Sequence, residues 1–293
     1  MTILQWGTGV VWAGLVMPGT QNVLTQFPPR VQHWVRLACQ REYRTRNRKL
    51  ERLRKTPRYT RTHTDLLGAN LEIPDAASFL VLYEDLIVRE AYRFEAARTE
   101  PVIIDGGANI GVSTIYFKRA YPQSRIIAFE PDPEIFKILE ENCNAFGLSG
   151  VELIQKALWL SDGFLRFKRE GSDAGRVART SDYGEVIDVS ACRLRPYLNE
   201  EVDLLKLDIE GAETAVLHDC ADLLSNVRHL FVEYHSFVDA PQTLRTICEL
   251  LHDAGFRLHI QSPMSSRQPF VHRDVYLGMD LQLNIFAFRP PTP

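Results

Sequence analysis

Cysteine is scarce in this sequence of 293 residues, and its five cysteines form no pattern. Cys39, Cys143, Cys192, Cys220 and Cys248 lie far apart and include no Cys-x-x-Cys pair, which excludes a disulfide framework or a zinc-finger spacing as the basis of the fold. Reduced thiols are typical of a reducing compartment, so we expect a cytoplasmic protein.

Long apolar runs are also missing. Residues 3–17 are moderately apolar, but Gln5, Gly7 and Gly14 interrupt them, and the stretch is shorter than the roughly 20 apolar residues of a spanning helix. Residues 1–29 contain no charged side chain, so the basic region that begins a signal peptide is missing as well. We therefore expect a partly ordered arm in this stretch.

Positive charge is concentrated in one segment. Residues 30–61 hold 12 of the 34 lysines and arginines but only two acids, Glu42 and Glu51, which leaves the rest of the chain with a formal net charge of −13. We assign residues 1–61 to a basic N-terminal arm that contains a helix from Val31 to Leu53. Three roles are open for this helix. It is exposed to solvent, it forms a subunit contact in a homo-oligomer, or it binds anionic lipid or an anionic substrate.

A glycine-rich turn follows the short apolar strand Val102–Ile104. The order of strand, glycine turn and amphipathic helix opens a nucleotide-binding α/β fold. Neither phosphate-binding motif is present, because the third glycine of Gly-x-Gly-x-x-Gly is missing and Gly111 is followed by Val112 instead of lysine. The acid before the turn, Asp105, favours a cation over a phosphate. S-adenosylmethionine (SAM) carries an ammonium and a sulfonium and no phosphate.

A second acid, Glu130, stands at the end of the next short strand, 126–130. A carboxylate at this point accepts hydrogen bonds from ribose hydroxyls. NAD enzymes carry an acid here too, so only its combination with the first turn favours SAM. Asp132 either supports Glu130 or begins the next helix.

The third motif lies at the end of a later strand and reads Lys-x-Asp-x-Glu-Gly-x-Glu from Lys206 to Glu213. Together with the Asp-x-Gly-Ala-Asn-x-Gly turn of residues 105–111, it resembles the hallmarks of the FkbM family of SAM-dependent methyltransferases. The stretch Val232-Glu233-Tyr234-His235 is a further family-like element. The resemblance covers about residues 70–288 and implies methyl transfer to hydroxyls of sugars or polyketide-type natural products, with S-adenosylhomocysteine as the second product.

The resemblance also implies a fold. We expect residues 101–293 to form the class I SAM-methyltransferase fold, a Rossmann-like α/β fold with helices on both faces of a mostly parallel seven-stranded sheet. Residues 62–100 form an N-terminal helical cap, in which Asp75 caps a helix. The strands are expected at 102–105, 126–130, 151–155, 203–207, 229–234, 256–260 and 283–288, the last one antiparallel. Helices are expected at 112–121, 133–146, 212–224 and 241–254. Phe164–Lys168 and Val186–Val189 are expected to pair as a hairpin.

Ligands of such sheets sit beyond the carboxyl ends of the strands, and this rule selects the candidate cofactor contacts. They are Asp105, Gly107, Asn109, Gly111, Glu130, Asp132, Ala157 and Asp208. Among them Ala157 follows the third strand, where its backbone would line the adenine.

The candidate catalytic residues are Asp208, Glu210 and His235. Asp208 and Glu210 end the fourth strand, and alternation places them on one side with Lys206 if the segment stays extended. His235 follows an apolar strand, and an unperturbed pKa of about 6.5 suits a general base. Glu213 is interpreted as a first-turn acid that the helix dipole favours. Asp208, Glu210 and His235 also suit a divalent metal, but nothing fixes a coordination spacing, so no metal site is predicted.

Features of the sequence oppose three alternatives to an O-methyltransferase. Enzymes that methylate base amino groups typically carry Asn/Asp-Pro-Pro-Tyr/Phe after the fourth strand, whereas this chain reads Asp208-Ile209-Glu210-Gly211 and has an acidic body that repels phosphates. The missing third glycine opposes an NAD(P)-dependent oxidoreductase. Acids at every expected strand end oppose a catalytically silent binding module. We therefore expect a small-molecule or glycan acceptor and no nucleic acid.

Overall fold

The computed structural model describes Pro28, residues 32–33, 40–171, 175–178, 184–263, Ser266 and residues 268–289. The chain divides into two compact units, Met1–Lys55 and Thr56–Pro293. In the first unit, α3 (Arg41–Arg54) confirms the second half of the predicted basic helix. Most of its first half and the apolar arm lie outside the described residues. Among the described residues, no helix has both the length and the apolar character that crossing a membrane requires.

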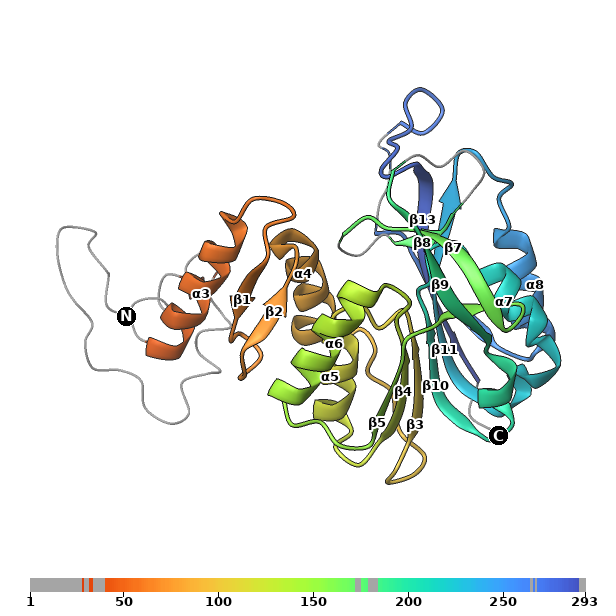
Figure 1. Ribbon diagram of the computed structural model, residues 1–293, viewed down its shortest axis with the longest axis horizontal. Helices are drawn as coiled ribbons and strands as arrows, with labels where there is room; N and C mark the ends of the chain where they lie inside the picture. Colours follow the sequence, from red (N-terminus) through yellow and green to blue (C-terminus); the bar gives the residue numbers. More distant parts are fainter. Residues whose placement is uncertain are drawn as a thin grey trace, which may run out of the picture. The chain divides into compact units, whose positions relative to one another are not determined.

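A seven-stranded sheet forms the centre of the second unit, with the strand order β12-β13-β11-β10-β3-β4-β5 (Figure 1). The strands are β3 (Val102–Gly106), β4 (Arg125–Phe129), β5 (Val151–Ile154), β10 (Val202–Leu207), β11 (Val227–Phe237), β12 (Arg257–Gln261) and β13 (Met279–Phe288). Only β13 runs antiparallel to its neighbours, and the other six strands are parallel. The predicted fold class is therefore confirmed, including the reversed last strand.

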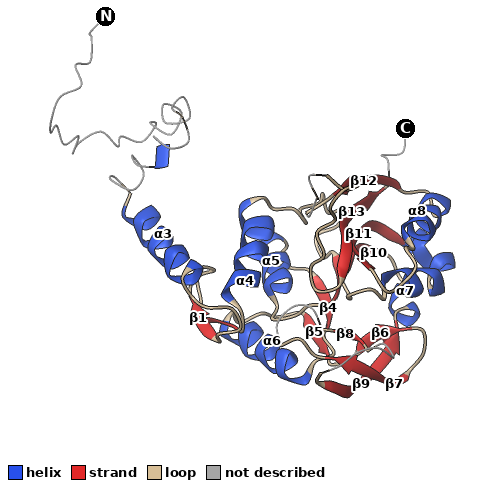
Figure 2. Cartoon of the chain, turned by 90° about the horizontal axis from the view of Figure 1, so that it is seen from above, coloured by secondary structure: helices blue, strands red, loops and turns tan. Residues whose placement is uncertain are grey.

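Helices cover both faces of this sheet (Figures 1 and 2). One face carries α4 (Ala76–Leu82), the π-helix η1 (Tyr83–Val88), α5 (Val112–Ala120) and α6 (Pro133–Ala145), and the other carries α7 (Glu213–Asp219) and α8 (Leu244–Asp253). Right-handed crossovers explain the division, because the chain adds strands in opposite directions from β3 and from β10. The helix expected at 212–224 is interrupted, since α7 ends at Asp219 and the 3-10 helix η3 (Ala221–Asn226) follows.

The core lies where the central strands are covered on both sides. Ile104, Leu205, Leu207, Leu230 and Val232 are fully or almost fully buried in one apolar cluster. Runs of apolar and β-branched residues are typical of parallel strands that are buried on both faces. This burial fixes the positions of the strand ends, where the polar residues of the motifs stand.

The cap packs against α6. Its hairpin of β1 (Thr62–Thr64) and β2 (Leu71–Ile73) is tied down by the buried Asn142, whose side chain exchanges hydrogen bonds with the backbone of Glu72 and donates to the Ile110 carbonyl. Asp75 caps α4 by accepting a hydrogen bond from the Ala77 N–H, as predicted. The cap also packs against α5, where Arg119 donates to the Leu67 carbonyl and Phe117 stacks on Tyr92.

A second sheet lies beside the main one, with the order β6-β9-β7-β8. Its strands are β6 (Ala157–Trp159), β7 (Gly163–Lys168), β8 (Arg176–Val177) and β9 (Val186–Arg193). The predicted hairpin is confirmed, because β7 and β9 pair antiparallel with Leu165 opposite Val189. A 3-10 helix, η2 (Arg195–Leu198), leads from this sheet back to β10.

Candidate active site

The carboxyl ends of β3, β4, β10 and β11 open into a cavity of about 820 Å³. The cap, the small sheet and the strands β12 and β13 complete its walls. All residues that line it belong to the second unit, beginning with Arg58. A volume of this size accommodates a nucleoside-type cofactor together with part of a second molecule.

The glycine turn is shaped by close backbone contacts. Gly107 has a φ of 78°, and a Cβ on it would lie 1.8 Å from the Asp208 carbonyl oxygen. The N–H groups of Gly107 and Ala108 both donate to the Phe129 carbonyl. Gly111 has a φ of 88°, and its Cβ would lie 2.7 Å from a Leu139 methyl carbon. The glycines are therefore required by packing, and only Gly107 also lines the cavity.

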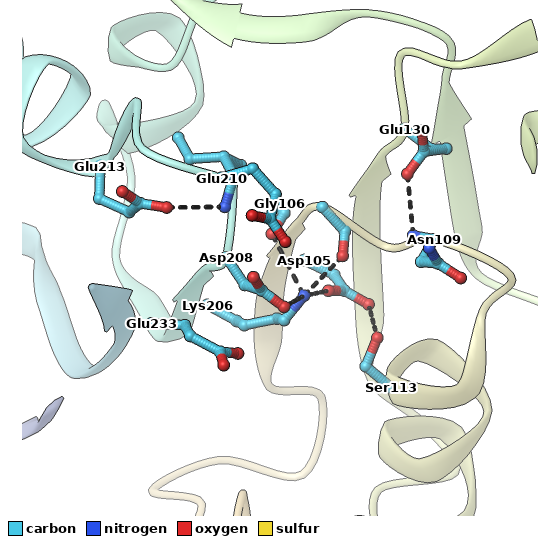
Figure 3. A network of polar contacts seen from close by, with 12 residues as sticks. Asp105, Gly106, Asn109, Ser113, Glu130, Lys206, Asp208, Glu210, Glu213 and Glu233 are labelled. Carbon is cyan, nitrogen blue, oxygen red and sulfur yellow. Dashed lines mark hydrogen bonds and ion pairs between the residues drawn. The ribbon is translucent and has the colours of Figure 1, made fainter. Parts of the chain in front are cut away.

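Asp105 lies beneath this turn and does not line the cavity. Its side chain is fully buried, and Oδ2 accepts a hydrogen bond from Ser113 Oγ at 2.6 Å (Figure 3). The same oxygen accepts a second hydrogen bond from Thr114 Oγ1 at 2.8 Å. The two hydroxyls belong to the first turn of α5. The sequence analysis predicted Asp105 as a cofactor contact, but its position supports an indirect role, because it holds the turn and the helix together.

The cation that faces Asp105 is a residue of the chain itself, Lys206. Its Nζ donates to the Gly107 carbonyl at 2.6 Å and lies 3.4 Å from both Asp105 Oδ1 and Asp208 Oδ2 (Figure 3). Burial lowers the pKa of Lys206, but the carboxylates of Asp208 and Asp105 outweigh burial and raise the pKa above its ordinary value. Lys206 is therefore charged, and it joins the ends of β3 and β10.

Glu130 lines the cavity at the end of β4. Its oxygens accept hydrogen bonds from the N–H groups of Asn109 at 3.1 Å and Asp132 at 2.9 Å. Burial raises the pKa of this carboxyl to about 7, and the two N–H donors oppose the rise. Glu130 and Asn109 are thus brought together at the cavity, where the sequence placed the ribose site.

Asp132 has both of the roles that the sequence left open. Its side chain caps α6 by accepting from the Glu134 N–H at 2.9 Å, and its own N–H supports Glu130. Its Oδ2 also accepts from Arg169 Nε at 2.8 Å. Arg169, whose side chain is 12% exposed, pairs further with Glu134 and Glu185. Arg169 was not among the predicted residues, because no local pattern shows that the end of β7 meets the start of α6.

Ala157 also lines the cavity, between Lys156 and Leu158. It is the first residue of β6 and is buried. Ala157 lines the same cavity as Glu130. Its contact with an adenine stays a prediction.

The three predicted catalytic residues converge from two strands. Asp208 directly follows β10, and His235 lies near the end of β11. His235 Nε2 is 4.0 Å from Asp208 Oδ1 and 3.7 Å from Glu210 Oε2. The segment does not stay extended, because Glu210 has a φ of 55° and Gly211 one of 97°. The expected alternation therefore ends with β10, and a turn brings Glu210 to the cavity instead.

Glu213 has a larger role than the predicted one at the helix dipole. The side chain is buried, and its Oε1 accepts from the N–H groups of Ile209 at 3.1 Å and Gly211 at 3.0 Å. The same oxygen lies 3.0 Å from His235 Nδ1. Glu213 thus holds the turn and fixes the orientation of the imidazole.

The electrostatic surroundings of His235 differ from those assumed for an ordinary histidine. Burial lowers its pKa, but Glu210 and Glu213 outweigh burial and raise the pKa well above the ordinary value. The expectation of an unperturbed titration near neutral pH is therefore wrong, because the sequence does not show how many carboxylates surround the ring.

Glu233 is a further cavity residue to which the sequence analysis gave no role. It lies two residues before His235 on β11 and accepts a hydrogen bond from Gln282. Burial and the nearby Asp208 raise its pKa to about 8. One ligand atom each of Asp208, Glu233 and His235 lie within 4.8 Å of one another. The signal in the sequence was the alternation of Glu233 and His235, which places both on one face of the strand.

The comparison with known proteins agrees with this arrangement. A sequence profile described as "Methyltransferase FkbM domain" matches residues 105–258, more than half of the chain. The chain belongs to the FkbM methyltransferase family. It is therefore a SAM-dependent methyltransferase, and the matched stretch contains the glycine turn, Glu130 and the cluster of Asp208 and His235.

Three relatives of this FkbM methyltransferase cover most of their own length in the alignment. Methyltransferase 1 of Beauveria bassiana is 29% identical over 211 residues, with 62% of this chain and 82% of the relative covered. Methyltransferase sdnD of Sordaria araneosa is 30% identical over 213 residues, with 60% and 81% covered. The 2-O-methyltransferase NoeI of Sinorhizobium fredii is 27% identical over 189 residues, with 57% and 76% covered.

The cavity of this FkbM methyltransferase has two chemically different halves. The half at β3, β4 and β6 contains Gly107, Asn109, Glu130 and Ala157. The half at β10, β11 and β13 contains acids, His235 and amides, including Asn284, whose Oδ1 is buried and makes no hydrogen bond among the described residues. The first half matches the predicted cofactor side, and the second leaves polar groups for another molecule.

Proposed function

We propose that this chain transfers the methyl group of SAM to a hydroxyl group of a sugar, a glycan or a polyketide-type natural product. The observation that carries the proposal is the shared cavity, in which Glu130 and the glycine turn face the cluster of Asp208, Glu210 and His235. The name of the relative from Sinorhizobium fredii, a 2-O-methyltransferase, supports oxygen as the acceptor atom.

Binding of the cofactor is assigned to the half of the cavity at β3 and β4. The buried carboxylate of Glu130 keeps lone pairs beyond its two backbone hydrogen bonds, which suits two ribose hydroxyls. Asn109 and Gly107 present backbone beside it, and Asp105 fixes the turn from below. Bound SAM supplies a methyl group that is already activated, so orientation by these residues contributes about 7–11 kcal/mol.

The proton of the acceptor hydroxyl is assigned to the cluster of Asp208, Glu210 and His235. A hydroxyl is a weak nucleophile, and a positioned general base contributes about 10²–10⁴ in rate. Glu213 holds the imidazole through Nδ1, so Nε2 and the carboxylates of Asp208 and Glu210 face the same part of the cavity. The amide groups on β13 orient the acceptor beside them.

Calorimetric titration with S-adenosylhomocysteine tests the cofactor half, with NAD(H) titrated in parallel. We expect micromolar binding by the wild-type chain and a loss of at least about tenfold in Glu130→Gln, because the amide accepts fewer hydrogen bonds from hydroxyls. Glu134→Gln is the matched control, since the Glu134 side chain is 67% exposed and lies only four residues away. A folded wild-type chain that does not bind S-adenosylhomocysteine would overturn the proposal.

Methyl transfer itself is tested with a panel of hydroxylated acceptors and radiolabelled SAM. We expect product with at least one sugar or polyol. Glu210→Gln and His235→Gln should reduce kcat while S-adenosylhomocysteine still binds. Transfer that is confined to amine or nucleic-acid acceptors would contradict the assignment to oxygen.

A further inference from the structure

Three side chains with metal-ligating atoms meet at the ends of two neighbouring strands. Asp208 follows β10, and Glu233 and His235 stand two residues apart on β11, so they face the same side of the sheet. One atom from each lies within 4.8 Å of the others, and all three residues line the cavity. A cation bound at this place would be reachable from the cavity.

His235 is prepared to be a ligand. Its side chain is 2% exposed, and its Nδ1 is held by Glu213 at 3.0 Å. Its Nε2 makes no hydrogen bond to any residue that the structure describes, and the nearest carboxylate oxygens lie 3.7 Å and 4.0 Å away. In metal sites a carboxylate commonly fixes one ring nitrogen of a histidine in this way, while the other nitrogen binds the metal.

Acidic groups outnumber basic groups around this point. Five carboxylates surround the strand ends, and they belong to Asp105, Asp208, Glu210, Glu213 and Glu233 (Figure 3). Two basic side chains meet them. Lys206 lies against Asp105, Oδ2 of Asp208 and the carbonyls of the glycine turn. The imidazole of His235 lies nearest to Glu213 and Glu210. Oδ1 of Asp208 points instead toward His235. Buried acids are costly unless a cation compensates them.

We propose that Asp208, Glu233 and His235 bind one divalent cation of the oxygen-preferring class, Mg²⁺ or Mn²⁺. Two carboxylates and one imidazole without a thiolate suit this class, and three protein ligands leave positions open toward the cavity. The cation compensates the acids and lowers the pKa of a hydroxyl that binds to it, and Glu210 accepts the proton. The role in methyl transfer rests on the proposed function, whereas binding of the cation does not.

Binding is tested by electron paramagnetic resonance of Mn²⁺ titrated into the full chain after treatment with a chelator. We expect one bound Mn²⁺ per chain, displaced by Mg²⁺. Asp208→Asn, Glu233→Gln and His235→Gln should each weaken binding by at least about tenfold. Glu213→Gln should weaken Mn²⁺ binding by about 10–100-fold. This variant keeps all three ligands but removes the carboxylate that holds the His235 ring. Circular dichroism melting shows that each variant is folded.

The matched control is Glu201→Gln, which changes a carboxylate to an amide at the opposite end of β10. Glu201 is 61% exposed and pairs with Arg228, so Mn²⁺ binding should not change. A wild-type chain that binds no Mn²⁺, or one whose binding is the same in the three ligand variants, overturns the proposal.

A second titration includes S-adenosylhomocysteine to separate two sources of positive charge. If the acids serve the ammonium group of the cofactor, saturation with S-adenosylhomocysteine abolishes Mn²⁺ binding, and the proposal is overturned. Binding of both together supports it. If S-adenosylhomocysteine binds and Mn²⁺ does not, the proposed cation site is refuted and the proposed function stands. If Mn²⁺ binds and S-adenosylhomocysteine does not, the proposed function is contradicted and the proposed cation site stands.

Discussion

Glu130 is a buried carboxyl whose protonation should control cofactor binding. Its pKa is about 7, and only the ionised form accepts hydrogen bonds from both ribose hydroxyls. We expect the affinity for S-adenosylhomocysteine to rise by about tenfold from pH 6 to pH 8, as the ionised fraction rises from about a tenth to about nine tenths. Calorimetry over this range checks it. A pH profile that stays the same in Glu130→Gln would show that another group is responsible.

The same residue links stability to pH. The folded chain keeps the Glu130 proton up to about pH 7, whereas an ordinary glutamate releases it near 4.5. The native state therefore binds more protons than the unfolded state in this window, and the stability that Glu130 contributes falls as pH rises through it. Glu130→Gln should be more stable than wild type by about 3 kcal/mol at pH 8 and about equal near pH 4.5. Urea unfolding at both pH values measures the difference.

Gly107 tests the close approach of the turn to the end of β10. A Cβ would lie 1.8 Å from the Asp208 carbonyl oxygen, and φ is positive, so Gly107→Ala combines a backbone clash with strain. We expect a loss of at least about 3 kcal/mol in the free energy of unfolding. Gly147→Ala is the control, because φ is also positive there but nothing lies within 4 Å of the added methyl. Its cost should be about 1 kcal/mol. Equal costs would contradict the clash.

At the scale of elements, Asp132 connects α6 with the small sheet. Its carboxylate caps the helix and pairs with Arg169, which follows β7. Asp132→Asn keeps an oxygen for the cap and loses the ion pair, whereas Asp132→Ala loses both. We expect the alanine variant to unfold with a free energy about 1 kcal/mol lower than the asparagine variant. Urea unfolding of the two proteins measures this. Equal stability would mean that the cap contributes nothing.

At the scale of the whole molecule, the described residues of the first compact unit, Met1–Lys55, line no part of the cavity. The cavity is lined entirely by residues from Arg58 onward, and the second unit begins at Thr56. We therefore expect a truncated chain of residues 56–293 to fold and to bind S-adenosylhomocysteine as tightly as the full chain. Calorimetry and thermal unfolding check this. A loss of binding would show that residues 1–55 complete the site.

Much of the fold follows from local patterns. Short apolar runs that alternate with amphipathic stretches predicted the strands of the main sheet and the hairpin at 164–189, because burial on both faces imposes such runs. Element ends differed where a contact from elsewhere intervened. For example, α8 was expected to begin at residue 241 but begins at Leu244. The N–H of the preceding residue, Thr243, donates to the Tyr234 hydroxyl. The sequence shows no sign of such a bond.

The sequence by itself determined three of the polar residues that gather at the cavity. The carboxyl ends of parallel strands meet at one edge of a sheet, so Glu130, Asp208 and His235 were selected by their places after apolar runs. The FkbM motifs determined the family in the same way, because the glycine turn and the strand end at Lys206–Glu213 are contiguous stretches.

Only the tertiary structure decided what each residue contacts. Asp105 on β3 contacts Lys206 on the neighbouring strand β10 instead of facing the cavity. Glu213 holds His235, which lies 22 positions later in the chain. Glu233 joins Asp208 because β10 and β11 are neighbours in the sheet. These contacts depend on side-chain direction and on distances of a few ångströms. Such distances are set by the packing of the whole sheet, and no local pattern specifies them.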